Sequence, residues 1–100
     1  MEIESIRHKA LRYFAETGRA KGLPGNPSAS SGLERLRTML AYLAAIESVE
    51  ELKVPPNYGA HELTGNRAGI WSLTVTKNWR LTFRINTSLA IEDIDLEDCH

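Results

Sequence analysis

Residues 65–84 are GNRAGIWSLTVTKNWRLTFR, and this stretch decides the fold of the chain. Apolar and polar residues alternate over 70–76 and again over 79–85, with the period of two that a half-buried β-strand requires. Lys77-Asn78 lies between the two runs and suits a tight turn. The apolar positions are Trp71, Leu73 and Val75 in the first run and Trp79, Leu81, Phe83 and Ile85 in the second. The stretch therefore predicts a β-hairpin with one apolar face.

Further strands are predicted on both sides of this hairpin. Residues 58–63 favour a strand, and TGNRAG at 64–69 favours a turn whose two glycines suit backbone conformations closed to other residues. A last strand is predicted near 89–96, and residues 2–6 favour a short strand at the start. The hairpin and its neighbours together predict an antiparallel sheet of about four strands.

Two main helices are predicted before the sheet. The first covers residues 7–16, and Gly18 suits the left-handed position that follows a helix end. The second covers residues 32–47, where leucines recur at helical intervals. Residues 17–30 between them are rich in Gly, Pro and Ser and predict a loop.

After the second helix, Ser48 and Glu51 stand at capping-box spacing, which predicts a short helical turn that Pro55 and Pro56 terminate. Helices come first and strands afterwards. This order predicts an α+β fold in which two main N-terminal helices pack on a twisted antiparallel sheet. We expect a single domain over residues 1–100, because so short a chain holds one core.

The composition of the chain excludes several classes of protein. Hydrophobic residues make up 42% and charged residues 25% of the chain, and no apolar run approaches a membrane span. The opening MEIESIRHKALRYF is unlike a secretory signal, so we expect a cytoplasmic protein with no membrane role. Cys99 is the only cysteine, which excludes an intramolecular disulfide. A net charge of −1 and a pI of 6.3 exclude a protein that coats nucleic acid by bulk charge.

Positive charge is nevertheless concentrated around the hairpin. Arg67, Lys77, Arg80 and Arg84 fall in this region, against the single acid Glu62. Strand alternation places Arg80 and Arg84 on the polar face about 13 Å apart, a spacing that suits successive phosphates of one nucleic-acid strand. The same pattern also fits an ordinary solvated sheet face, and these two arginines alone favour that solvated-face interpretation.

Two histidines supply candidate acid–base chemistry. His61 precedes the glycine-rich turn and His100 follows the last strand, so the two imidazoles can meet across the sheet. One can take the 2′-hydroxyl proton of RNA while the other protonates the leaving 5′ oxygen. Which histidine acts as base stays open, and the spacing alone favours two ordinary surface or core histidines. His8, at a predicted helix start, is assigned a structural role.

A zinc site is the alternative for the same residues. The tail EDCH at 97–100, together with His61, offers carboxylate, thiolate and imidazole ligands. No paired spacing such as CxxC or HxxxH supports such a site. We therefore expect no metal. We expect no organic cofactor either, because the chain is short and contains neither a P-loop nor a GxGxxG motif.

Taken in order, these motifs resemble the HigB branch of the RelE toxin superfamily, also called plasmid maintenance system killer proteins. The resemblance covers nearly the whole chain: IRHKALRYFAETG, then ERLRTMLAYLAAIESVEEL, then GNRAGIWSLTV and NWRLTFR, and an acidic end before His100. It implies a compact RelE-like fold and the toxin of a type II toxin–antitoxin system. Such toxins cut messenger RNA in the ribosomal A site and leave a 2′,3′-cyclic phosphate, without a metal.

The resemblance also implies roles for single residues. The catalytic set is His61, Arg80, Asp98 and His100, in which Arg80 stabilises the phosphorane and Asp98 orients His100. We further expect RNA contacts from Arg67, Lys77, Arg84 and Thr64.

Two positions depart from the family pattern. Thr64 stands where relatives have a lysine, and Cys99 stands where they have a tyrosine. Threonine cannot bring positive charge to a developing phosphorane, and cysteine lacks the hydrogen bond and stacking surface of a phenol. Both changes predict reduced catalytic activity.

The implied partners are a HigA-like helix-turn-helix antitoxin, the ribosome and messenger RNA, with operator DNA reached only through the antitoxin complex. Two other functions stay open. One is a non-catalytic or weakly active RelE-fold protein that serves as antitoxin partner and transcriptional co-repressor, which the two departures favour. The other is a ribosome-independent ribonuclease, which so small a basic patch disfavours.

Overall fold

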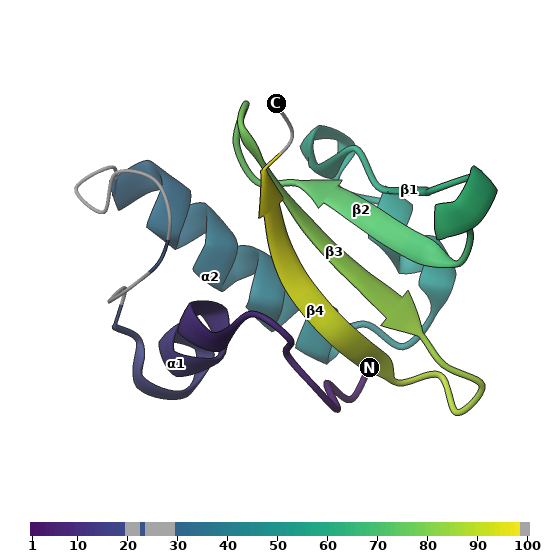
Figure 1. The fold of residues 1–100 in the computed structure, drawn as a ribbon, viewed down its shortest axis with the longest axis horizontal. Helices are drawn as coiled ribbons and strands as arrows, with labels where there is room; N and C mark the ends of the chain where they lie inside the picture. Colours follow the sequence, from purple (N-terminus) through teal and green to yellow (C-terminus); the bar gives the residue numbers. More distant parts are fainter. Residues whose placement is uncertain (20–22, 24–29, 99–100) are drawn as a thin grey trace.

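A computed structural model describes residues 1–19, 23 and 30–98 (Figure 1). Its helices are α1 (Lys9–Thr17) and α2 (Ser30–Ala45), its 3-10 helices are η1 (Val49–Lys53), η2 (Pro56–Tyr58) and η3 (Gly65–Arg67), and its strands are β1 (His61–Glu62), β2 (Ile70–Thr74), β3 (Trp79–Ile85) and β4 (Ile91–Asp98). Helices precede strands, which confirms the α+β prediction. Both main helices form close to their predicted bounds.

The predicted hairpin forms as β2 and β3. Trp71 lies opposite Phe83, and Leu73 lies opposite Leu81, so these apolar side chains share a face. Thr76 and Trp79 exchange backbone hydrogen bonds of 3.2 and 3.4 Å across Lys77-Asn78, which makes these two residues the loop of a tight turn. The strand order is β1-β2-β3-β4 with every pair antiparallel, and the predicted four-stranded sheet is confirmed.

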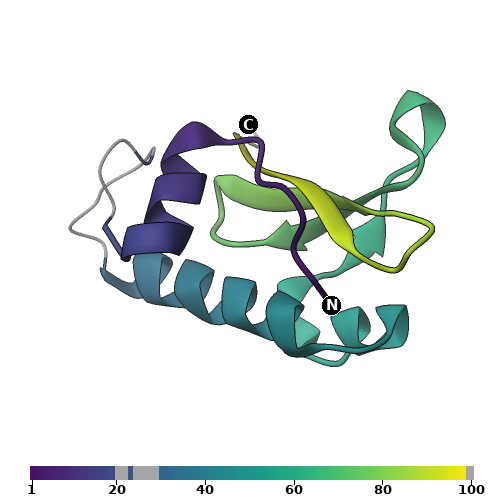
Figure 2. The same ribbon diagram turned by 90° about the horizontal axis from the view of Figure 1, so that it is seen from below.

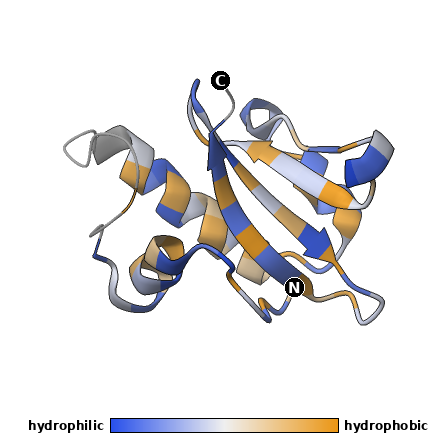
Figure 3. Cartoon of the chain, in the orientation of Figure 1, coloured by the Kyte–Doolittle hydropathy of each residue, from blue (hydrophilic) through white to orange (hydrophobic). Residues whose placement is uncertain are grey.

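Helix α2 covers the apolar face of the sheet, and Figure 2 shows it running along that one side. In Figure 3 apolar and polar residues alternate along the strands, because successive side chains point to opposite faces. The largest fully buried side chains are Leu11, Met39, Leu43, Leu52, Leu73, Leu81, Phe83, Ile91 and Ile94. Trp71 and Trp79 are partly buried against this core. Among the residues that the structure describes, no helix runs along the opposite face of the sheet.

Helix α1 begins and ends as its sequence predicts. The His8 ring precedes the helix, and its Nδ1 accepts a hydrogen bond of 3.2 Å from the backbone N–H of Leu11. Gly18 follows the last turn with a φ of 77° and donates its N–H to the Phe14 carbonyl at 2.8 Å. His8 is therefore a helix cap, which confirms its structural role.

The turn after α2 contains the predicted capping box. The Glu51 carboxylate accepts the backbone N–H groups of Glu47 at 2.7 Å and Ser48 at 2.9 Å, and these hydrogen bonds lower the pKa of Glu51. The strand predicted at 58–63 is wrong over most of its length, because only His61–Glu62 pairs with β2. Gly59, with a φ of 57°, turns the chain out of the extended conformation just before that pairing.

The strand predicted at residues 2–6 is also incomplete. Ile3 and Ile6 form two isolated parallel bridges to β4, so the segment lies along that strand without a continuous ladder. The interruption falls at Asp93, whose φ is 56° and whose N–H bonds to the Ser5 hydroxyl at 2.8 Å instead of a backbone carbonyl. Within the described part of the chain, no helix has the length and apolar character to cross a membrane.

Candidate active site

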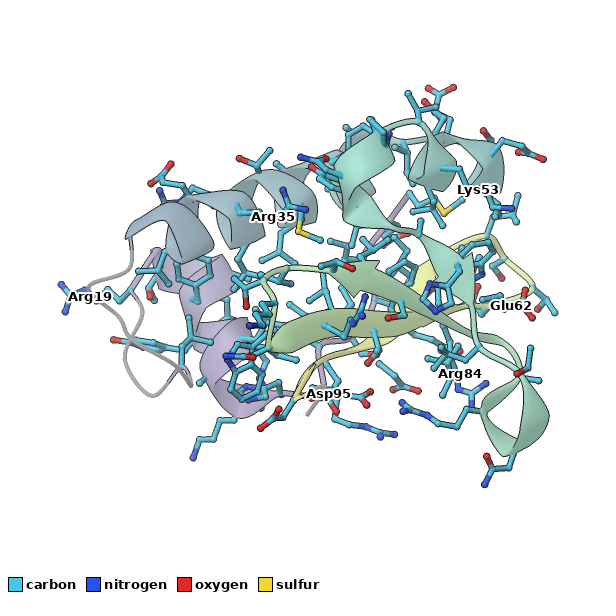
Figure 4. The ribbon with its side chains drawn as sticks, turned by 90° about the horizontal axis from the view of Figure 1, so that it is seen from above. Arg19, Arg35, Lys53, Glu62, Arg84 and Asp95 are labelled. Carbon is cyan, nitrogen blue, oxygen red and sulfur yellow. The ribbon has the colours of Figure 1, made fainter. Side chains whose placement is uncertain are left out.

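The face of the sheet opposite α2 carries two rows of polar side chains. In the first row His61 lies opposite Ser72, Ser72 opposite Thr82, and Thr82 opposite Asp95. In the second row Thr74 lies opposite Arg80, and Arg80 opposite Glu97. Figure 4 shows Arg84 and Asp95 on this side of the sheet, away from α2. Directly opposed residues share a face, so strand pairing alone gathers an imidazole, guanidinium groups and carboxylates.

This polar face is not simply solvated. Ser72 and Thr82 are each only 4% exposed, although they lie on the side without a helix. The cover includes Glu97 of β4, which accepts a hydrogen bond of 2.5 Å from the Thr82 hydroxyl. Polar side chains that are buried under other polar side chains indicate a preorganised site. This favours the functional interpretation of the basic face over a solvated one.

A shallow, open hollow of about 220 Å³ lies on this face. Its lining residues are His61, Leu63, Arg67, Ser72, Arg80, Thr82, Glu97 and Asp98. Three residues expected to be catalytic, His61, Arg80 and Asp98, are thus brought together although they are far apart in the sequence. Arg67, expected to contact RNA, joins them from η3.

His61 enters the hollow from β1 with its ring oriented by the backbone. Its Nδ1 lies 2.9 Å from the Gly59 carbonyl oxygen. A carbonyl can only accept, so Nδ1 must carry the proton. In the neutral ring the lone pair is then on Nε2. The fold therefore selects the tautomer in which Nε2 can accept a proton.

Arg80 is held by its neighbour across the hairpin. Its Nη1 donates a short hydrogen bond to the Thr74 hydroxyl, and the two residues are opposite one another in the β2–β3 register. The side chain is half-buried. A guanidinium held in this way keeps its remaining N–H donors in a fixed plane, which suits phosphate oxygens.

Glu97 is a site residue that sequence reasoning named only as a candidate zinc ligand. Its Oε2 accepts from Arg67 Nη2 at 2.7 Å as well as from Thr82. The bond from Arg67 chiefly holds the pKa of Glu97 below its ordinary value, and the same pair raises the pKa of Arg67. The signal lies in the alternation of β4, because Asp95 and Glu97 share a face and Glu97 falls opposite Arg80.

A second, smaller hollow of about 70 Å³ adjoins the first. Its lining residues are Arg7, Arg67, Ile70, Thr82, Phe83, Arg84, Asp93, Asp95 and Glu97. Arg67, Thr82 and Glu97 line both hollows and form the wall between them. Arg80 and Arg84 therefore share a face of the sheet as predicted, but each lines a different one of the two neighbouring hollows.

The other predicted site residues lie around this centre. Thr64 is exposed and precedes η3, and its carbonyl accepts the Arg67 N–H at 3.4 Å. Lys77 is exposed in the β2–β3 turn. Asp98 ends β4 opposite Trp79. His100 and Cys99 lie outside the described residues, so the predicted meeting of His61 and His100 stays a prediction.

The turn that carries Arg67 depends on two glycines, as predicted. Gly65 has a φ of 69° and Gly69 a φ of 91°, both in the left-handed region that favours glycine. No group of three or more His, Cys, Asp or Glu side chains that could hold a metal occurs among residues 1–19, 23 and 30–98. The zinc alternative stays untested, because Cys99 and His100 lie outside the described residues.

We predict that Glu97→Gln makes the folding stability less dependent on acid. The folded-state pKa of Glu97 is lowered from 4.5, so its pair with Arg67 stabilises the fold fully above pH 4.5 and is lost as the pH falls towards the lowered pKa. Near neutral pH the variant should be less stable by about 1 kcal/mol or less, because Arg67 is 44% exposed and water screens the pair.

Urea unfolding at pH 7 and at pH values below 4.5 measures this difference. Wild type and variant should converge at the acidic end. A stability gap that stays constant or widens on acidification would show that the Glu97 charge does not contribute in this way.

Comparison with known proteins identifies the family. A family model described as the RelE-like toxin of type II toxin–antitoxin system HigB matches residues 4–98. Among curated proteins, Endoribonuclease HigB of Proteus vulgaris is 34% identical over 99 residues, which cover 98% of this chain and 99% of that protein.

Solved structures agree on the fold. A mutant of YafQ from E. coli has a TM-score of 0.60 at 13% identity, over 98% of this chain and 94% of that chain. The YoeB/ParE toxin from Agrobacterium tumefaciens has a TM-score of 0.51 at 16% identity, over 97% and 99% of the two chains. These likenesses confirm the predicted architecture. The family model and the relative from Proteus vulgaris place the chain in the family of HigB-like, RelE-like toxins of type II toxin–antitoxin systems.

Proposed function

We propose that this protein is an endoribonuclease toxin that cleaves messenger RNA in the ribosomal A site. The observation that carries the proposal is the hollow on the polar face, where strand pairing gathers His61, Arg80 and Arg67. The relative from Proteus vulgaris is named an endoribonuclease, and this arrangement offers a proton acceptor and cations for the same chemistry. The reaction is attack of the ribose 2′-hydroxyl on the adjacent phosphate, without a metal or organic cofactor.

His61 is the general base in this proposal. Because Nδ1 donates to the Gly59 carbonyl, Nε2 is free to take the 2′-hydroxyl proton. The conjugate cation that forms keeps its Nδ1 bond. The resemblance left open which histidine is the base, and the backbone contact favours His61.

Arg80 and Arg67 stabilise the charge that develops on the phosphorane. Arg80 has its plane fixed by Thr74, so little reorganisation is needed at the moment of reaction. Thr64 cannot replace the lysine of the relatives, but Arg67 reaches the hollow from the same helical turn. The Arg67 guanidinium, three residues later, supplies the positive charge that Thr64 lacks. To contact the phosphate it gives up its hydrogen bond to Glu97.

The remaining roles follow the family pattern. His100 protonates the leaving 5′ oxygen, and Asp98 orients it. Lys77 and Arg84 hold RNA phosphates on either side of the cleaved bond. The partners are a HigA-like helix-turn-helix antitoxin and the ribosome, and the chain reaches operator DNA only in complex with that antitoxin.

Primer extension on a translated message after induction in bacteria tests this function. Cuts that require translation and fall within codons support the proposal. An intact message together with binding to a coexpressed antitoxin would establish instead the non-catalytic partner that Thr64 and Cys99 favour. Equal cleavage of an untranslated transcript would show that the nuclease acts without the ribosome.

A further inference from the structure

One arginine on α2 joins three parts of the chain that surround the candidate active site. Arg35 Nη2 donates to the Asn57 carbonyl at 2.6 Å and to the Thr74 carbonyl at 3.1 Å. Its guanidinium also lies over the Tyr58 ring, 5.4 Å from the ring centre. Figure 4 labels Arg35 at α2, on the other side of the sheet from Arg84 and Asp95. Arg35 thus ties α2, η2 and the end of β2 together.

The contact of Arg35 with Thr74 leads to Arg80. Arg35 binds the backbone carbonyl of Thr74, and the hydroxyl of the same residue accepts the hydrogen bond from Arg80. Thr74 is the last residue of β2, just before the turn of the hairpin. A guanidinium bound to its carbonyl fixes the backbone from which the Thr74 hydroxyl holds Arg80.

The contacts of Arg35 with Asn57 and Tyr58 lead to His61. Asn57 and Tyr58 end η2, and Gly59 follows with a φ of 57°. Gly59 lies against the Thr74 side chain so closely that a Cβ at this position would come within 3.2 Å of the Thr74 hydroxyl. The carbonyl of Gly59 is the group that orients the His61 ring. Fixing Asn57 and Tyr58 therefore fixes the acceptor that selects the His61 tautomer.

We propose that Arg35 is a positioning residue that holds His61 and Arg80 in register across the candidate active site. The proposal rests on the function proposed above for those two side chains. Arg35 itself stays at α2 and does not line the hollow. The planar guanidinium of Arg35 can donate to both carbonyls and stack on the Tyr58 ring at the same time. A lysine at this position would offer only one compact charge.

Arg35→Lys and Arg35→Ala test the proposal, with Arg37→Ala as the matched control. Arg37 lies on the same helix, is exposed, and pairs with Glu34 at 2.6 Å. Cleavage of a message on programmed ribosomes is followed at increasing protein concentration, at a temperature where circular dichroism shows each variant folded. The two Arg35 variants should lose about 10- to 100-fold in the rate at saturation, with the half-saturating concentration and the Arg37 variant unchanged.

Thr74→Val supplies a test that does not depend on whether Arg35→Ala folds. It removes the hydroxyl that holds Arg80 and leaves the carbonyl that Arg35 binds. Because Thr74→Val breaks only the path from Arg35 to Arg80, the double variant with Arg35→Lys should lose less than the product of the two single losses. The loss that remains beyond Thr74→Val is the path through Gly59 to His61. Fully multiplied rate losses would overturn the path through Thr74 and with it the proposal.

Nitrogen NMR of the His61 ring separates this proposal from the proposed function. In the wild type the tautomer with the proton on Nδ1 should dominate, and in Arg35→Lys the two tautomers should mix. Unchanged ring signals and an unchanged saturating rate in a folded Arg35→Lys would overturn the positioning role. If the wild type cleaves no message at all, the proposed function fails, and the ring signals still decide the role of Arg35.

Discussion

His61→Ala is expected to lower the rate of message cleavage by about 10²–10⁴-fold, the range for loss of a general base. The ring is the proton acceptor that the Gly59 carbonyl orients, and alanine leaves only water in its place. Because His61 is exposed on a short edge strand, its loss should barely change the melting temperature. Single-turnover cleavage on programmed ribosomes, together with thermal unfolding, measures both effects.

Glu62→Ala is the matched control for this variant. It lies on the same short strand, opposite Trp71 and not Ser72, so its side chain leaves the strand on the other side. Its cleavage rate should match the wild type. Equal rates for His61→Ala and wild type would remove His61 from the catalytic set.

Arg80→Ala is expected to lower the rate by about 10²–10³-fold, the range for loss of one preorganised donor to a developing oxyanion. Arg80→Lys should recover only part of this loss, because an ammonium lacks the fixed plane that the Thr74 bond imposes. Rates at saturating protein concentration are the relevant measurement, since the charge develops in the transition state and not in the bound message.

Arg12→Ala serves as the control for loss of a single positive charge. Arg12 is exposed on α1 and lines neither hollow of the polar face. A comparable drop in both arginine variants would indicate a general effect of losing one positive charge, and it would contradict a specific role for Arg80.

The hairpin and its two faces could be predicted because they depend on local rules. Alternation over β2 and β3 determined which side chains are buried, and Lys77-Asn78 marked the turn. The ends of α1 were likewise visible in the sequence, since a capping side chain and a left-handed glycine act on the nearest backbone groups. Local hydrogen bonding decides such features without information from the rest of the chain.

The edges of the sheet were less predictable. The extent of β1 depends on where Gly59 turns the chain, and a glycine in a polar stretch is equally compatible with a longer strand. The interrupted pairing of residues 2–6 depends on Asp93, whose left-handed conformation shifts the β3–β4 register. Gly59 permits a left-handed conformation without requiring it, and Asp93 adopts one although it is not a glycine.

The candidate site was predicted in part. Arg80 was expected on the polar face, His61 in the catalytic set and Arg67 among the RNA contacts, and the three line one hollow. Five acids crowd the end of the chain, and only the register of β4 shows that Glu97 is the one opposite Arg80. Arg35 was not predicted at all, since its acceptors are backbone carbonyls, which every residue has.

The most direct test of the proposed function is the cleavage of one message by purified protein, with and without ribosomes positioned on it. We predict cuts only in the sample with ribosomes, within the codon in the A site, and an upstream fragment that ends in a 2′,3′-cyclic phosphate. A message that stays intact on ribosomes, or that is cut equally when naked, would contradict the proposal.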